Sequence, residues 1–82
     1  MTNQFGSSDD AIKVGLSITG HTDEPLTENN ELRISQFGNP LETVKAVEYT
    51  RKDGMKIAIV STKFRDGFDC WIVGPSGFAQ RV

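Results

Sequence analysis

The sequence is poor in the residues that usually carry catalytic chemistry or covalent cross-links. Its 82 residues include one cysteine, one histidine, one tryptophan and one tyrosine. A single cysteine excludes a disulfide within the chain, and His21 has only the carboxylates of its own loop as companions for a metal ion. We therefore expect no disulfide framework, no metal site and no cofactor.

Long apolar segments are also missing. No unbroken run of apolar residues exceeds four, as in Ile57–Val60. The first ten residues have no basic stretch that leads into an apolar one. These absences predict neither a secretory signal nor a membrane span, and we expect a cytoplasmic protein.

Catalytic and phosphate-binding motifs are not found either. The serines that stand near glycines, Ser17 and Ser76, lack the second glycine of a G-x-S-x-G nucleophile elbow. No Walker A or dinucleotide-binding glycine pattern occurs. Cys70 lies within an apolar stretch, which is typical of a small buried side chain. The sequence predicts a protein that is not an enzyme, and an accessory subunit of an enzyme is the remaining catalytic role.

Charge is modest overall but uneven along the chain. The net charge is −2, divided into −5 for residues 1–42 and +3 for residues 43–82. A basic half can indicate nucleic-acid binding. Values of this size are also typical of ordinary solvated faces, and we favour that interpretation.

The N-terminal half predicts a terminus, a strand, a loop and a weaker strand. Residues 1–10 are polar and small, which is typical of a flexible terminus, and residues 11–82 form one globular domain. Residues 11–19 alternate with period two, which predicts a strand with one buried face. Residues 20–30 have the composition of a loop, and residues 31–37 predict a second strand. The inward side chains of these two strands are Ile12, Val14, Leu16, Ile18, Leu32 and Ile34.

Residues 39–50 fit two interpretations. Asn39 followed by Pro40 resembles a helix start, and apolar residues then recur at helical spacing. Against this, residues 43–51 are rich in β-branched and aromatic residues and lead into a turn signal. We favour a strand from Val44 and keep a short helix near residues 40–50 as the alternative.

Two similar turns organise the C-terminal half. Residues 52–54 (KDG) and 65–67 (RDG) each stand between strand-like runs, and we predict three-residue loops that end in a glycine with positive φ. The first loop places Tyr49 opposite Ile57. The predicted pairs of the second loop are Phe64 with Phe68, Lys63 with Asp69, Val60 with Ile72 and Ile59 with Val73, with Cys70 opposite Thr62.

The turns together predict a three-stranded antiparallel meander. We expect a mainly β domain, built as a small antiparallel sheet or a partly closed sandwich or barrel of four to five strands. The alternative is an α+β domain that contains the short helix near residues 40–50.

Both faces of this meander are apolar, and both therefore need to be covered. Aromatic residues, Met and Arg are enriched at protein interfaces. We hypothesise that one face is a docking surface for another protein or for a second copy of the chain. The alternative is that the N-terminal strands bury this face as the core of the domain. The candidate partner-binding residues are Lys45, Tyr49, Arg51, Met55, Ile57 and Trp71.

Single-stranded nucleic acid is the rival partner, because basic and aromatic residues are interleaved in residues 45–71. The two turns, however, lie about 26 Å apart at opposite ends of the central strand, and their basic residues cannot share one compact patch. We expect a small protein-binding module that acts as an inhibitor or modulator of a larger protein or as a self-associating assembly component, such as a homodimer.

Overall fold

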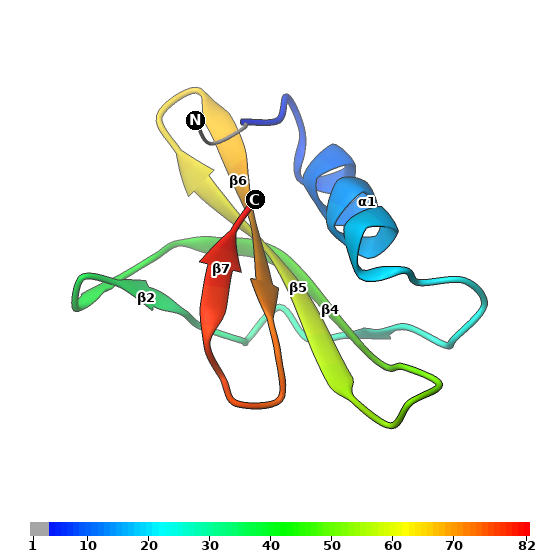
Figure 1. The fold of residues 1–82 in the computed structure, drawn as a ribbon. Coiled ribbons are helices and arrows are strands. Elements are labelled where there is room, and N and C mark those ends of the chain that lie inside the picture. Colours follow the sequence, from blue (N-terminus) through cyan, green and yellow to red (C-terminus); the bar gives the residue numbers. More distant parts are fainter. Residues whose placement is uncertain (1–3) are drawn as a thin grey trace.

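The computed structural model describes residues 4–82, which form a five-stranded antiparallel sheet with one helix against it (Figure 1). The strand order in this sheet is β1-β4-β5-β6-β7, and a separate small sheet pairs β2 with β3. The prediction of a mainly β domain is confirmed, and within residues 4–82 the sheet does not close into a barrel. The elements are α1 (Ser8–Thr19), β1 (Thr27–Glu28), β2 (Ser35–Gln36), β3 (Asn39–Pro40), β4 (Thr43–Thr50), β5 (Lys56–Phe64), β6 (Gly67–Val73) and β7 (Ala79–Arg81).

The strand predicted for residues 11–19 was wrong, because this segment forms most of the helix α1. The hydroxyl of Ser7 accepts a hydrogen bond from the backbone N–H of Asp10 at 3.1 Å and so caps the first turn. Two carboxylates in that turn, Asp9 and Asp10, are favourable at the positive end of the helix dipole. Gly20 ends the helix with a φ of 81°.

The spacing of apolar residues in this segment fits a helix as well as a strand. Ala11, Ile12 and Gly15 are buried, and Leu16 is half-buried against the same core, which is the i, i+1, i+4, i+5 pattern of one helix face. Ile12 and Leu16 belong to both periods. Ile18, which the strand interpretation placed inward, is instead 57% exposed.

The first ten residues include residues 1–3, which lie outside the described part of the chain. The described part of this segment, residues 4–10, pairs with the sheet and includes the start of α1. Phe5 exchanges two backbone hydrogen bonds with Phe68, at 2.9 and 3.0 Å, and Ser7 caps α1. Phe5 thus pairs with the part of the β6 edge that β7 leaves uncovered.

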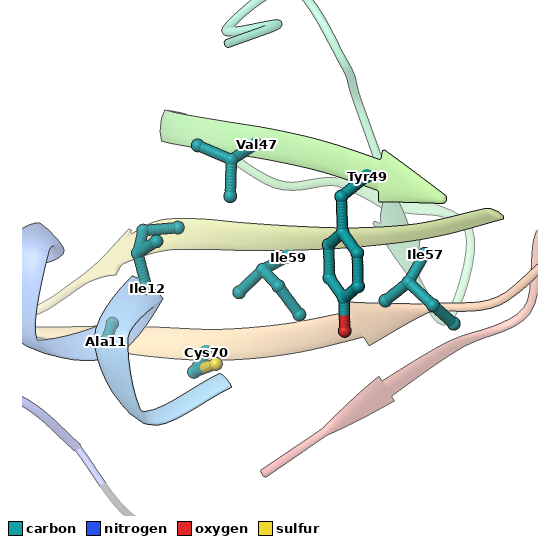
Figure 2. Close-up of a cluster of buried hydrophobic side chains, with 7 residues drawn as sticks. All are labelled: Ala11, Ile12, Val47, Tyr49, Ile57, Ile59 and Cys70. Carbon is teal, nitrogen blue, oxygen red and sulfur yellow. The ribbon is translucent and has the colours of Figure 1, made fainter. Parts of the chain in front are cut away.

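Helix α1 covers one face of the five-stranded sheet (Figure 1). Its approach is close because position 15 is glycine: a Cβ atom there would lie 2.5 Å from Cγ2 of Ile59 and 2.9 Å from Sγ of Cys70. Figure 2 shows the resulting core between the helix and the three central strands. Its buried members are Ala11, Ile12, Val47, Tyr49, Ile57, Ile59 and Cys70.

A second core lies on the other face of the sheet. Buried residues of β4, β5 and β6, namely Ala46, Val60 and Trp71, pack there with Ile34. Leu32 and Leu41 lie at its margin, so the segment that contains β2 and β3 covers this face. The predicted inward orientation of Leu32 and Ile34 is confirmed, although strand pairing in residues 31–37 is limited to Ser35–Gln36.

The first hairpin has the predicted register. Tyr49 pairs with Ile57 and Val47 pairs with Ile59, and Gly54 ends the loop with a φ of 88°. Residues 43–50 form a strand, so the favoured interpretation of residues 39–50 is confirmed and the alternative helix near residues 40–50 is not observed.

The second hairpin is shifted by one residue from the predicted register. Its loop has two residues, because Arg65 adopts a left-handed φ of 55° and Gly67 already belongs to β6. The predicted partners were therefore wrong throughout. The observed pairs are Phe64 with Gly67, Lys63 with Phe68, Thr62 with Asp69, Ser61 with Cys70, Val60 with Trp71 and Ile59 with Ile72.

The packing of both faces explains this shift. The observed register places the small Cys70 side chain under the close contact of α1 at Gly15. It places Trp71 on the second face, where its indole N–H donates to the Thr62 hydroxyl at 2.9 Å. The predicted register would have placed an indole under the helix, where there is no room for one.

Candidate partner-binding site

The predicted docking face is the face that α1 covers. Tyr49 and Ile57 are only 3% and 4% exposed, and both lie in the helix-side core (Figure 2). The hydroxyl of Tyr49 donates to Oγ1 of Thr19 at 2.6 Å, and the His21 ring contacts the Tyr49 ring edge-on with centroids 4.8 Å apart. Neither residue is available to a partner while the helix is docked.

Trp71 lies on the opposite face, apart from Tyr49 and Ile57. It is 5% exposed and belongs to the second core. The guanidinium of Arg81 lies 5.7 Å from the centre of its ring and also pairs with the buried carboxylate of Asp69 at 3.7 Å. Trp71 therefore stabilises the fold from within.

The other three predicted residues lie nearer the surface and are dispersed. Lys45 is half-buried and its ammonium pairs with Asp9 of α1 at 3.1 Å. Arg51 pairs with Asp53 in the β4–β5 turn at 2.9 Å, and Met55 is exposed beside that turn. The six residues therefore do not form one accessible surface.

An exposed aromatic at the tip of the β2–β3 hairpin was not among the predicted residues. Phe37 is 94% exposed and has a φ of 53°, and Gly38 follows with a φ of 79°. Positive φ at both central residues of a two-residue loop defines a type I′ turn, in which Asn and Gly are the favoured residues. A phenylalanine in this conformation costs about 1 kcal/mol or more of backbone strain.

The base of this hairpin is firmly attached to the domain. Ile34 is buried in the second core, and its carbonyl accepts a hydrogen bond from the backbone N–H of Leu41 at 3.0 Å. The hydroxyl of Thr43 donates to the carbonyl of Leu32 at 2.8 Å. Figure 1 shows the hairpin extending away from the five-stranded sheet, so a fixed base presents the Phe37 ring to solvent.

A groove of about 350 Å³ adjoins the base of the hairpin on the second face. Glu48 and Lys56 border it as an ion pair at 3.0 Å. The hydrogen bond from the Asn29 amide, together with Lys56, holds the pKa of Glu48 below its usual value. The groove is mostly apolar and is lined by Leu32, Glu48, Lys56, Ala58, Val73, Gly74, Pro75 and Gly77.

The chain matches no family model, no curated protein and no solved structure. The residues alone must therefore indicate what the hairpin and the groove do.

The residues around Phe37 carry a signal for the hairpin tip, although Phe37 was not predicted as a binding residue. Its neighbours are Gln36, Gly38 and Asn39, so Phe37 is an isolated apolar residue in a polar segment. Its apolar character alone suggests a side chain that helps to cover the sheet. The turn-forming residues that follow it instead favour a loop tip.

Neither a metal site nor a membrane-spanning helix is found in the described residues. Across residues 4–82, no three His, Cys, Asp or Glu side chains come together in a way that could hold a metal ion. The helix found in this range is neither long enough nor apolar enough to cross a bilayer.

Burial raises the pKa of the Cys70 thiol to about 11. The unfolded chain would ionise near the reference pKa of 9.0. The stability that the neutral thiol contributes is therefore complete below pH 9.0 and is lost as the pH rises toward 11. Urea unfolding of the wild type and of Cys70→Ala should show the difference in stability between the two proteins falling across this range. A pH-independent difference would contradict the buried, neutral thiol.

Proposed function

We propose that the chain is a non-enzymatic protein-binding module whose anchor residue is Phe37. The observation that supports this most is the combination of 94% exposure and a left-handed φ at this residue. An exposed phenyl ring gains no burial energy, and its backbone conformation costs stability, so the fold gains nothing from it. Strain of this kind is found preferentially at functional sites.

A protein partner suits this geometry. Aromatic residues that enter a pocket of the partner are typical binding hot spots, and a hairpin tip can reach into such a pocket. The groove beside Leu32 continues the apolar surface at the base of the hairpin. A small module that presents one rigid anchor is suited to the role of an inhibitor or modulator of a larger protein.

We rank single-stranded nucleic-acid binding lower. Stacking platforms need aromatic faces that are open to bases. Here the ammonium of Lys63 lies 4.6 Å from the Phe68 ring centre, and the guanidinium of Arg65 lies 5.0 Å from that of Phe64. The basic side chains around the β5–β6 turn thus lie over the aromatic rings on which bases would have to stack.

Replacing Phe37 by asparagine separates binding from folding. Asparagine tolerates positive φ, so the free energy of unfolding should rise by about 1 kcal/mol. Loss of a hot-spot side chain should at the same time weaken partner binding by about 2 kcal/mol or more, roughly 30-fold. Urea unfolding measures the first effect, and calorimetry with the purified partner measures the second.

The partner is obtained by photo-crosslinking. A photoreactive phenylalanine at position 37 is exposed to native extract, and the same residue at the exposed position Asp66 in the β5–β6 turn, which does not line the groove, serves as the control. The captured protein is purified and titrated with the wild type, Phe37→Asn and Phe37→Trp, where tryptophan should retain binding. Equal affinities of the wild type and Phe37→Asn would contradict the proposal.

A further inference from the structure

The two edges of the five-stranded sheet differ in how they are protected. At one edge, β1 and the following loop cover β4: Asn29 donates its backbone N–H to the carbonyl of Ala46, and the side chain of Asn30 accepts from the N–H of Ala46, both at 2.9 Å. At the other edge, β7 pairs with β6, and no other helix or strand within residues 4–82 contacts β7. The β7 edge is therefore open.

The hydrogen bonds on either side of β7 show which backbone groups point outward. Val82 donates to the carbonyl of Cys70 at 2.9 Å, and Gly74 donates to that of Phe78 at 3.5 Å. In an antiparallel pair, residues bonded to the neighbouring strand alternate with residues that are not. Ala79 and Arg81 fall on the alternate positions, so their N–H and C=O groups face away from β6.

The side chains of β7 do little to guard this edge. Natural edge strands are usually protected by being very short, by proline, by a bulge or by charged side chains, and of these β7 has only its short length of three residues. Residues 79–81 contain no proline, and their one charge, Arg81, turns inward toward Asp69 and the Trp71 ring. Phe78, immediately before the strand, is 68% exposed.

We propose that β7 pairs antiparallel with β7 of a second copy of the chain, about a twofold axis at Gln80. This register places Ala79 opposite Arg81 of the second copy. The outward N–H and C=O groups of these residues can then bond to each other, because both face the axis. The two five-stranded sheets become one continuous sheet, with the closed twofold symmetry that is commonest among protein dimers.

The same register is self-complementary in its side chains. Phe78, Gln80 and Val82 lie on the face that carries α1, because they alternate with Ala79 and Arg81. The axis then sets Phe78 against Val82 of the second copy and the Gln80 amide against its own equivalent. Apolar side chains thus contact apolar side chains, the two Gln80 amides contact each other, and no like charges lie opposite one another. This self-complementarity is the reason that we propose a second copy of the chain as the binding partner.

This inference is independent of the proposed function, because it uses β7 and not the β2–β3 hairpin. Light scattering coupled to gel filtration, from low micromolar to submillimolar concentration, should show the mass rising toward twice that of the 9.0 kDa chain. A wild-type chain that stays monomeric throughout would overturn the inference, and the Phe37 titration would still be informative.

Two variants at one position test the edge itself. Ala79→Pro removes an outward N–H that makes no bond to β6, and proline is tolerated at such edge positions. We expect the dissociation constant of the dimer to rise at least about tenfold, equivalent to 1.4 kcal/mol, whereas Ala79→Ser keeps the N–H and should dimerise like the wild type. Circular dichroism checks that both variants are folded. Undiminished dimerisation of folded Ala79→Pro would overturn the inference.

Amide hydrogen exchange of the wild type tests the same interface if Ala79→Pro does not fold. The N–H groups of Ala79 and Arg81 should exchange more slowly as the concentration rises, while that of Gln80, which faces β6, should not change. Dimer formation without added protection at Ala79 and Arg81 would show that the copies meet elsewhere and would overturn the inference.

Discussion

Replacing Trp71 by alanine is expected to lower the free energy of unfolding by about 3–5 kcal/mol. The indole is 5% exposed and packs with Ala46, Val60 and Ile34 in the second core. A domain of this size has a total stability of roughly 4–12 kcal/mol. The substitution therefore removes a large part of the stability, and the variant should be partly or fully unfolded at moderate urea concentration.

Trp71→Phe separates the contribution of ring packing to stability from the contribution of the indole hydrogen bond. Phenylalanine keeps most of the apolar contact but leaves the Thr62 hydroxyl, which is 1% exposed, without the indole N–H. An unsatisfied buried hydroxyl costs about 1–3 kcal/mol, so this variant should fall between the wild type and Trp71→Ala. Phe64→Ala, which removes an exposed ring, is the matched control and should change stability by less than about 1 kcal/mol.

An interface role for Trp71 predicts the opposite result. If Trp71 were part of an exposed docking surface, Trp71→Ala would leave the stability close to that of the wild type. Urea unfolding followed by circular dichroism distinguishes the two outcomes without any knowledge of the partner.

Gly15→Ala is expected to destabilise the chain by about 1–3 kcal/mol. In the interior of an exposed helix, the same substitution would stabilise by about 1 kcal/mol, because alanine has the higher helix propensity. Here the new methyl group would lie 2.5 Å from Cγ2 of Ile59 and 2.9 Å from Sγ of Cys70. The helix must then move away from the sheet, and the core beneath it loses contacts.

The sign of the effect makes this substitution informative. Ser17→Ala, on the exposed side of the same helix, should raise stability by a few tenths of a kcal/mol. Opposite signs for Gly15→Ala and Ser17→Ala support the close helix–sheet contact. Stabilisation by both variants would mean that α1 lies farther from the sheet than the structure places it.

Local sequence signals were sufficient where one turn type fitted both the loop and the strand pairing. The Lys52-Asp53-Gly54 loop has glycine at the position that needs positive φ, and Gly54 adopts it. The paired side chains of that hairpin, Tyr49 with Ile57 and Val47 with Ile59, are also favourable neighbours. Loop and pairing therefore gave the same register, and the prediction was correct.

The prediction for the other turn failed because the deciding interactions are distant in the sequence. The Arg65-Asp66-Gly67 loop resembles the first, but here Arg65 itself takes the left-handed conformation. The register depends on the space beneath Gly15 and on the bond between Trp71 and Thr62. Neither could be predicted while residues 11–19 were interpreted as a strand.

The strand prediction for residues 11–19 rested in turn on an ambiguous spacing of apolar residues. Ile12 and Leu16 satisfy alternation and helical spacing equally. The decisive residue was Ser7, whose capping hydroxyl lies in the segment that we had interpreted as a flexible terminus. The cap taken together with Asp9 and Asp10 would have favoured a helix.

The candidate site changed with the register. A one-residue slip moves every side chain of a strand to the other face, so the predicted grouping of Trp71 with Tyr49 and Ile57 depended on the β5–β6 pairing. With the observed pairing all three are buried, and the anchor that we propose is instead Phe37, the most exposed of the aromatic residues in residues 4–82.

The β5–β6 register is therefore the central claim, and cross-strand nuclear Overhauser effects between Hα protons test it most directly. Such contacts are strong between residues of non-hydrogen-bonded pairs, where the Cα atoms are about 4.5 Å apart. The observed register predicts them between Ser61 and Cys70 and between Ile59 and Ile72. Contacts between Ser61 and Trp71 and between Ile59 and Val73, the non-hydrogen-bonded pairs of the predicted register, would instead place Trp71 on the side of α1 and contradict the account.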